Sequence, residues 1–260
     1  MRLGFVGTGA ITSAMVTGLS SDVAEPPAIR LSPRNPGIAA DLANRFPRVS
    51  IASSNQDVLD HSEIVVLAIR PQIAPHVISE LRFRPEHRVI SVVSGLSLRL
   101  VSDLTTPAAK ITRAVPLPSV AQKRGPTAIY PPDGVVADLF AKLGTAFEVE
   151  GEGEFDALCA ATGTIASYFA FADSVASWLG GQGVPQGKAR DYVAQIFSGL
   201  GNTAVEASER SFQSLAGDHA TPGGINQQVL THFVEHGVFE IVSEGLDAVM
   251  RRIQSASQKS

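Results

Sequence analysis

The sequence has little cysteine, few aromatic residues and little charge. Of its 260 residues one is cysteine, 6% are aromatic and 18% are charged. The single cysteine, Cys159, excludes an intramolecular disulfide and is consistent with a reducing compartment, so we expect a cytoplasmic protein. Its neighbours in DALCAA are apolar, which favours a buried structural thiol.

Long apolar runs and targeting signals are also missing. The longest apolar run, IVVLAI at 64–69, is far shorter than the roughly 20 residues that cross a bilayer as a helix. The N-terminus shows no charged segment followed by an apolar segment and a cleavage site. We therefore expect neither a secretory signal nor a membrane partner.

The formal charge is small and unevenly distributed. A net charge of −4 argues against general affinity for nucleic acid. Residues 1–150 hold 15 Lys and Arg against 13 Asp and Glu, a net charge of +2, whereas residues 151–260 hold 6 against 12, a net charge of −6. The N-terminal part is therefore the better place for an anionic ligand.

Two hydrophobic patterns divide the chain near residue 150. Before it, short β-branched runs alternate with amphipathic segments that indicate helices. Strands are expected at 3–7, 28–32, 49–52, 63–69 and 88–94, with weaker signals at 110–115, 127–130 and 146–150. Continuous apolar strands separated by helices indicate a parallel sheet covered on both faces, and right-handed crossovers favour a doubly wound topology.

After residue 150, long helical patterns replace the strands. They cover roughly 154–179, 185–208, 225–235 and 238–255, with breakers such as GGQGVP between them. This apolar, Gly- and Ala-rich segment is expected to bury a face against a second copy of the chain. We predict at least a homodimer.

A glycine-rich turn joins the first expected strand to the first expected helix. In GFVGTGAIT, two glycines suit a tight turn and a close approach of backbone to a pyrophosphate, which the helix N-terminus stabilises. Thr12 replaces the usual third small residue, which is expected to displace the helix slightly without removing an amide. The predicted phosphate site consists of Gly7, Thr8, Gly9, Ala10 and Ile11.

The end of the second expected strand indicates which dinucleotide fits. An NAD site usually places Asp or Glu there, whereas this chain has Ser32-Pro33-Arg34-Asn35. Ser32 can donate its hydroxyl and Arg34 can form two hydrogen bonds with a 2′-phosphate. NADP is therefore preferred over NAD, the alternative being that Arg34 is an ordinary surface arginine.

These patterns together predict an α/β protein with two domains. Residues 1–150 are expected to form a doubly wound, Rossmann-type NADP-binding domain. Residues 151–260 are expected to form an all-α domain for dimerisation and substrate binding.

Several short segments, spread along nearly the whole chain, match the motifs of one known family. GFVGTGAITSAMVTGL is similar to GFIGxGNMAxAIxxGL, and Asn55 with VVLAIRPQ is similar to an asparagine followed by a strand and Lys-Pro-Gln. SVVSGLSL, TRAVPLPSVAQKRGPTAIY, ATGTIASYF and TPGGIN fall where that family has SxxAGI, RxMPNxPxxxxxGxTxxY, SGSGPAY and SPGGTT. By the order and spacing of these motifs, the sequence resembles pyrroline-5-carboxylate reductase.

The resemblance implies reduction of a cyclic imine, 1-pyrroline-5-carboxylate to proline, by hydride transfer from NADPH in proline biosynthesis. It also implies interlocked helical domains in a dimer. Cofactor contacts are implied for Asn55, Ala68, Arg70 and Pro116. Catalytic roles are implied for Thr164 and Asn226, and substrate binding for Thr221, Gly223, Gly224 and Ser167.

The departures from the family pattern cluster in the motifs implied in substrate binding. Val115 and Leu117 replace the methionine and asparagine of MPN, and both threonines of PGGTT are lost. This leaves open a member that acts on a different imine, or an NADP-binding protein without activity that serves as a sensor. TPGG could equally be only a helix start capped by Thr221, and Ser167 and Tyr168 could be helix packing.

Three other functions are less consistent with the sequence. HFVEH at 232–236 matches the H-x-x-E-H metalloprotease pattern but no third ligand or cleft is indicated nearby, so we expect a solvated helix face and no metal. A 3-hydroxyacid dehydrogenase would need a lysine on the first helix of the second domain, whereas only Lys188 and Lys259 follow Lys142. A ferric- or flavin-type NADP reductase shares only the first domain.

Overall fold

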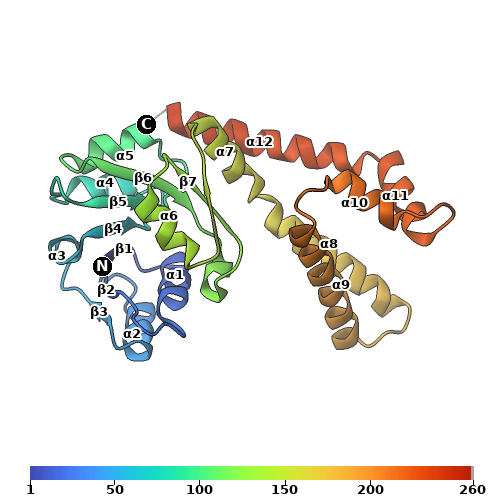
Figure 1. Ribbon diagram of the computed structural model, residues 1–260, viewed down its shortest axis with the longest axis horizontal. Helices are drawn as coiled ribbons and strands as arrows, with labels where there is room; N and C mark the ends of the chain where they lie inside the picture. Colours follow the sequence, from blue (N-terminus) through green and yellow to red (C-terminus); the bar gives the residue numbers. More distant parts are fainter. Residues whose placement is uncertain (259–260) are drawn as a thin grey trace. The chain divides into compact units, whose positions relative to one another are not determined.

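The first part of the chain forms an eight-stranded sheet. The computed structural model describes residues 1–258 (Figure 1), and the strand order is β3-β2-β1-β4-β5-β6-β7-β8. The strands are β1 (Arg2–Val6), β2 (Ala28–Leu31), β3 (Val49–Ile51), β4 (Ile64–Leu67), β5 (Arg88–Ser91), β6 (Lys110–Val115), β7 (Pro126–Tyr130) and β8 (Thr145–Glu148). All the strand segments expected from the sequence are present.

The direction of the strands follows the prediction up to β6. Strands β1 to β6 pair in parallel, whereas β7 is antiparallel to β6 and β8 is parallel to β7. Between β6 and β7 there is only a short 3-10 helix, η1 (Pro118–Gln122). A parallel pairing requires a longer crossover connection, so the chain returns antiparallel at this point.

Helices cover both faces of the sheet, as the continuous apolar strands predict. One core contains side chains of α1 (Ala10–Ser20), α2 (Pro36–Arg45) and α6 (Gly134–Ala141). The other contains side chains of α3 (Asn55–Asp60), α4 (Ala74–Ser79) and α5 (Leu98–Thr105). Alternate residues of a strand point into opposite cores: Val66 of β4 belongs to the first and Val65 to the second. The doubly wound arrangement is confirmed.

The second part of the chain is helical. Its helices are α7 (Glu152–Ala161), α8 (Thr164–Gly181), α9 (Gln186–Glu206), α10 (Phe212–His219), α11 (Ile225–Glu235) and α12 (Val238–Gln258). The prediction of one helix at 154–179 is wrong, because α7 ends before Thr162. The N–H of Gly163 donates to the carbonyl of Ala160 at 2.9 Å, which closes a turn between the two helices. Helix α10, which the sequence patterns did not indicate, begins where the Ser211 hydroxyl accepts from the N–H of Ser214 at 3.1 Å.

Two compact units result. Residues 1–159 and the end of α12 from Met250 form one unit, and Ala160–Val249 form the other. Most of helix α7, up to Cys159, belongs to the sheet unit, where Arg113 of β6 pairs with Glu152 at 2.7 Å and with Asp156 at 3.1 Å. Burial raises the pKa of Asp156, although the Arg113 guanidinium opposes that shift. The division after residue 150 stays a prediction.

One segment, Glu152–Gly181, is long and apolar enough to cross a membrane by length and composition, with a mean hydropathy of 1.3 and 17% of its most apolar window buried. Length and composition alone are weak evidence for a membrane span, and this segment is divided between α7 and α8. Large apolar side chains are also exposed on other helices, including Tyr192 of α9 and Ile225 of α11. Apolar exposure is therefore a property of the helical unit as a whole.

Candidate functional site

A cleft of about 290 Å³ opens beyond the carboxyl ends of β1, β2 and β4. Strands β2 and β3 lie on one side of β1, and β4 and β5 lie on the other, so the order of connection reverses between β1 and β4. Ligands of doubly wound sheets bind at this switch point. The cleft is lined by Val6, Gly7, Thr8, Gly9, Arg34, Asn35, Asn55, Ala68, Ile69, Arg70, Ile73 and Val77.

The two glycines of the loop between β1 and α1 serve different purposes. Gly7 has a φ of +101°, and a Cβ there would overlap the carbonyl of Ala68, so both backbone and packing require glycine. Gly9 has an extended backbone, and a Cβ there would meet no atom within 4 Å. The missing side chain at Gly9 leaves open space at the cleft, which allows a ligand to approach the backbone closely.

The hydroxyl groups of three residues form hydrogen bonds that fix the conformation of the loop. Ser32 is completely buried, and its Oγ accepts a hydrogen bond from the N–H of Gly7 at 3.0 Å. The hydroxyl of Thr8 donates to the carbonyl of Ser32 at 2.8 Å, and the two hydroxyl oxygens lie 3.2 Å apart. The hydroxyl of Thr12 donates to the carbonyl of Gly7 at 2.7 Å. These bonds already engage the hydroxyl of Ser32 within the chain. Its predicted donation to a 2′-phosphate stays a prediction.

The start of α1 offers main-chain donors. Its N-cap, Gly9, has no side chain, and the N–H groups of the first turn have no acceptors within the helix. The helix dipole favours an anion at this end. Ala10 and Ile11 do not line the cleft with their side chains, so their predicted contribution reduces to their N–H groups.

Two arginines make the cleft electropositive. Arg34 and Arg70 are both exposed, and neither guanidinium has a hydrogen bond or ion pair with any of residues 1–258. No aspartate or glutamate is among the residues that line the cleft. Asn35, which follows Arg34 and also lines the cleft, has a φ of +64°, a conformation that asparagine tolerates. The open space at the loop and the two unpaired guanidinium groups suit a phosphorylated dinucleotide.

Most of the predicted cofactor residues meet in this cleft, although their contacts with a cofactor stay predictions. The lining includes Gly7, Thr8, Gly9, Arg34, Asn55, Ala68 and Arg70. Pro116, buried after β6, does not line it. Five lining residues were not predicted from the sequence: Val6, Asn35, Ile69, Ile73 and Val77. Ile73 is the N-cap of α4 and Val77 lies four residues later in the same helix. This spacing was the available signal that the two side chains share a face.

The predicted substrate residues fall in separate places within the helical unit. Thr164 and Ser167 line a cavity of about 720 Å³ whose other walls are mainly aliphatic and aromatic side chains of α8, α11 and α12. The hydroxyl of Thr164 donates to the carbonyl of Ala161 at 2.8 Å. A second hollow, of about 630 Å³, lies beside α11 and is lined by Gly223 and Gly224 among others. Asn226 lines neither of these two cavities. Neither of these two cavities contains both predicted catalytic residues.

The TPGG turn has its main-chain donors already paired. Gly223, at a φ of +73°, donates its N–H to Oε1 of Gln227 at 2.7 Å. The N–H of Gly224 donates to the carbonyl of Thr221 at 2.9 Å. Binding of a substrate carboxylate to these amides stays a prediction, and it requires the Gln227 side chain to move away.

Cys159 matches the expectation of a structural thiol. It lies on α7 and is half-buried, and burial raises the pKa of its thiol to about 12. The thiol therefore stays protonated at neutral pH, and it takes no part in nucleophilic chemistry there.

Two families of known proteins match separate parts of the chain. Residues 2–95 match the family described as NADP oxidoreductase coenzyme F420-dependent. Residues 152–256 match the family described as pyrroline-5-carboxylate reductase dimerisation. The first match covers the strands and loops that form the cleft, and the second covers the helices with exposed apolar side chains.

Whole-chain similarities agree with these matches. Pyrroline-5-carboxylate reductase 3 of Xenopus laevis is 25% identical over 278 residues, which cover 100% of this chain and 97% of the relative. The 1-pyrroline-5-carboxylate reductase of Streptococcus pyogenes has a TM-score of 0.85 at 25% identity, with 98% of each chain covered. The Plasmodium falciparum pyrroline carboxylate reductase, solved with NADP bound, has a TM-score of 0.83 at 21% identity with the same coverage. The paired domains, the shared fold and these relatives place the chain in the pyrroline-5-carboxylate reductase family of oxidoreductases.

Proposed function

We propose that the chain reduces 1-pyrroline-5-carboxylate to proline with NADPH. Its family establishes an oxidoreductase that uses a nicotinamide cofactor. The observation that supports NADPH in particular is the cleft, where Arg34 lies at the end of β2 in the position that usually carries an acid in NAD sites. A carboxylate there would repel a 2′-phosphate, whereas an unpaired guanidinium attracts one.

The chain's own residues bind and orient the cofactor. The N–H groups at the start of α1 hold the pyrophosphate, because the open space at Gly9 lets it reach the backbone. Arg34 binds the 2′-phosphate, and Arg70 adds a second positive charge on the opposite side of the loop. When bound, the reduced nicotinamide supplies the hydride that the imine carbon accepts. Positioning and charge stabilisation are then the protein's contribution.

The helical unit supplies the substrate side of this proposal. A protonated cyclic imine is already electrophilic, so a strong side-chain acid is not required. Thr164 and Ser167 bring hydroxyl groups into an otherwise apolar cavity, which suits a small ring with few polar atoms. Gly223 and Gly224 are proposed to bind the substrate carboxylate after Gln227 releases its hydrogen bond.

A different cyclic imine is the second candidate, and two observations favour it. The polar motifs that the family uses on the substrate side are altered, with Ile165 and Ala166 following Thr164. In addition, both amides of the Pro-Gly-Gly turn have partners within the chain. A protein that binds NADPH without turnover is the remaining alternative.

Turnover separates these functions. The purified chain is mixed with NADPH and pyrroline-5-carboxylate, and the loss of the absorbance of the reduced cofactor is followed. Formation of proline supports the proposal, and oxidation only with another imine, such as pyrroline-2-carboxylate, supports the second candidate. Tight NADPH binding without oxidation by either imine indicates a sensor, and no binding of NADPH contradicts all three.

The proposal also carries a biological setting. It assigns the chain to the last step of proline biosynthesis, in which a cyclic imine is consumed. A cytoplasmic location is consistent with the single cysteine and stays a prediction.

A further inference from the structure

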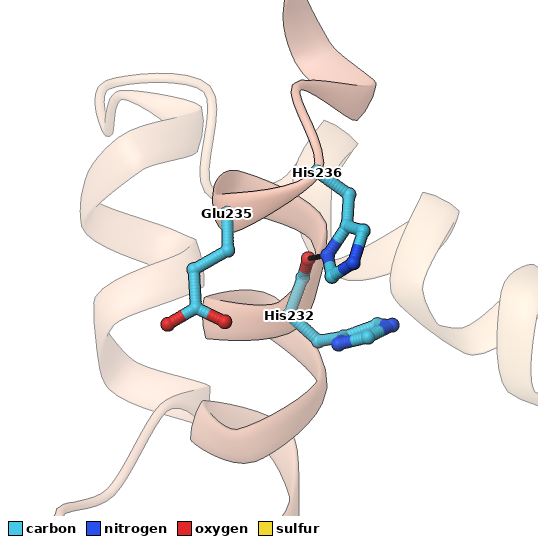
Figure 2. A group of neighbouring side chains, drawn as sticks. All are labelled: His232, Glu235 and His236. Atoms are coloured by element: carbon cyan, nitrogen blue, oxygen red, sulfur yellow. Dashed lines mark hydrogen bonds between the residues drawn. The ribbon is translucent and has the colours of Figure 1, made fainter.

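Three metal-ligating side chains gather at the C-terminal end of α11. His232, Glu235 and His236 each offer a ligand atom, and these atoms all lie within 4.8 Å of one another (Figure 2). The spacing along one helix explains this, because residues three and four apart occupy the same face. The cluster belongs to the H-x-x-E-H motif, which the proposed reductase activity does not use.

The histidines are oriented for an external ligand. Nδ1 of His236 lies 2.8 Å from the carbonyl oxygen of His232, and the hydrogen bond fixes this ring with its Nε2 facing away from the backbone (Figure 2). Metal-bound histidines in proteins usually have their second ring nitrogen held in this way. The two imidazole centroids are 4.1 Å apart, so both rings lie over the same stretch of helix.

The ligand atoms are also available. Within residues 1–258, the Glu235 carboxylate has no salt bridge or hydrogen bond, and the His232 ring has none either. All three side chains are exposed, so water can complete a coordination shell. His232 and Glu235 line a hollow of about 630 Å³ beside α11, which leaves room for an ion with its bound water.

We propose that His232, Glu235 and His236 bind one first-row transition-metal ion, with Zn²⁺ as the representative. Two imidazoles with one carboxylate are a donor set that suits Zn²⁺, Co²⁺ or Ni²⁺, whereas Mg²⁺ and Ca²⁺ prefer oxygen ligands alone. The sequence around the motif indicated no third ligand. The structure supplies one from the motif itself, because Glu235 lies within reach of both histidines.

Metal binding to the full-length protein in its assembled form tests this proposal. Isothermal titration with Zn²⁺ alone, checked by equilibrium dialysis, is expected to give one ion per chain. Because changes around a metal site cost about 10- to 100-fold in affinity even when the ligands are kept, His232→Ala and His236→Ala should each weaken binding at least tenfold. Glu235→Gln, which keeps an oxygen but loses the charge, should weaken it less.

A matched control is available on the preceding helix. Nδ1 of His219 lies 2.8 Å from the carbonyl of Leu215, the same bond that His236 makes, but residue 215 is not a histidine. His219→Ala should leave Zn²⁺ affinity unchanged. Loss of affinity in His219→Ala equal to that in His236→Ala, or wild-type stoichiometry in the His232→Ala/His236→Ala double variant, would overturn the site.

NADPH affinity serves as the check on folding. The cleft is built from other residues, so the double variant should bind NADPH as the wild type does. This readout is independent of imine turnover, so the metal site and the proposed reductase activity can fail separately. With Co²⁺ in place of Zn²⁺, visible absorption bands that the double variant lacks would support coordination by these imidazoles.

Discussion

Thr12 and Ser32 provide hydrogen bonds that the glycines of the phosphate loop cannot make with side chains. The sequence suggested that the bulk of Thr12 would displace α1 slightly. In the structure Thr12 is fully buried and its hydroxyl donates to the carbonyl of Gly7, which fastens the first turn of α1 to the loop. A residue that departs from the small-residue pattern therefore stabilises the loop through its hydroxyl.

Arg34 is expected to determine the preference for NADPH. A hydrogen bond to a charged group contributes about 1.5–3 kcal/mol, so Arg34→Ala should weaken NADPH binding roughly 10- to 100-fold. NADH, which lacks the 2′-phosphate, should be affected little. Fluorescence titration with both cofactors measures the ratio, and Arg48→Ala, an exposed arginine outside the cleft, is the control. Equal losses of affinity for NADPH and NADH would contradict the role of Arg34 in binding the 2′-phosphate.

Ser32 is expected to act on the loop and not on the 2′-phosphate. Ser32→Ala leaves the N–H of Gly7 without its acceptor, and an unsatisfied buried group costs about 1–3 kcal/mol. The loop should lose order, so affinity for NADPH and NADH should fall by the same factor, about tenfold. The same titrations measure this.

Ser50→Ala gives a comparison on the neighbouring strand, where Ser50 is the middle residue of β3. Its hydroxyl, on β3, is part of no loop contact and the change should leave both affinities as they are. If Ser32→Ala weakened NADPH alone, its hydroxyl would instead be a ligand of the 2′-phosphate, as the sequence suggested.

Among the elements, α3 is placed by a carboxylate that connects it to β2. Asp57 accepts hydrogen bonds from the N–H of Ser53 at 2.7 Å and from Arg30 of β2, also at 2.7 Å. These bonds, the one from Ser53 first, lower the pKa of Asp57 from 3.8 to about 2. The same helix begins with Asn55, which lines the cleft, so this network supports the site.

The free energy of unfolding at acid pH should depend on the hydrogen bonds that Asp57 accepts. Because the pKa of Asp57 is lower in the folded state, the unfolded state binds more protons between pH 3.8 and about 2, and the free energy of unfolding falls as the pH decreases through this range. Asp57→Asn should be less stable at pH 7 and should lose less stability on acidification. Urea unfolding at a series of pH values measures both effects.

The comparison variant for acid stability is Asp41→Asn. Asp41 makes an exposed pair with Arg45 four residues along α2, and such pairs contribute little. This variant should follow the wild-type pH dependence. A pH dependence of Asp57→Asn as steep as that of the wild type would show that the network does not act through this carboxylate.

At the scale of the whole molecule, the helical unit exposes many large apolar side chains. Trp178 of α8 and Ile241 of α12 are each 64% exposed, and Ile225 of α11 is 81% exposed. Exposed apolar surface is typical of protein interfaces when it gathers into patches. Together with the match to a dimerisation family over residues 152–256, this exposure supports homo-oligomerisation through the helical unit.

Placing a charge on this surface should disrupt assembly. Ile241→Glu introduces a carboxylate that would be buried without a partner in the oligomer, so the assembly should dissociate to smaller species. Light scattering after size-exclusion chromatography measures the mass, and circular dichroism checks that the helices persist. Val135→Glu, at a 42% exposed valine of α6 in the sheet unit, should leave the mass unchanged. An unchanged mass for Ile241→Glu would exclude this face from the interface.

The sequence by itself determined the doubly wound sheet, the glycine-rich loop and the arginine beside it. These follow from local patterns: alternating β-branched and amphipathic segments fix strands and helices, and Gly7 is required by its own backbone conformation. The reversal of β7 was not predictable in this way, because strand direction depends on the path of the connection. The break at Thr162 was hidden by an apolar pattern that continues across both helices.

Only the tertiary structure decided which side chains share a site. It placed the hydroxyl of Ser32 beneath the loop and paired the amide of Gly223 with Gln227, whereas sequence spacing suggested that both were free for ligands. Hydrogen-bond partners depend on distances across elements, which residue order does not contain, whereas secondary structure depends largely on the periodicity that residue order does contain.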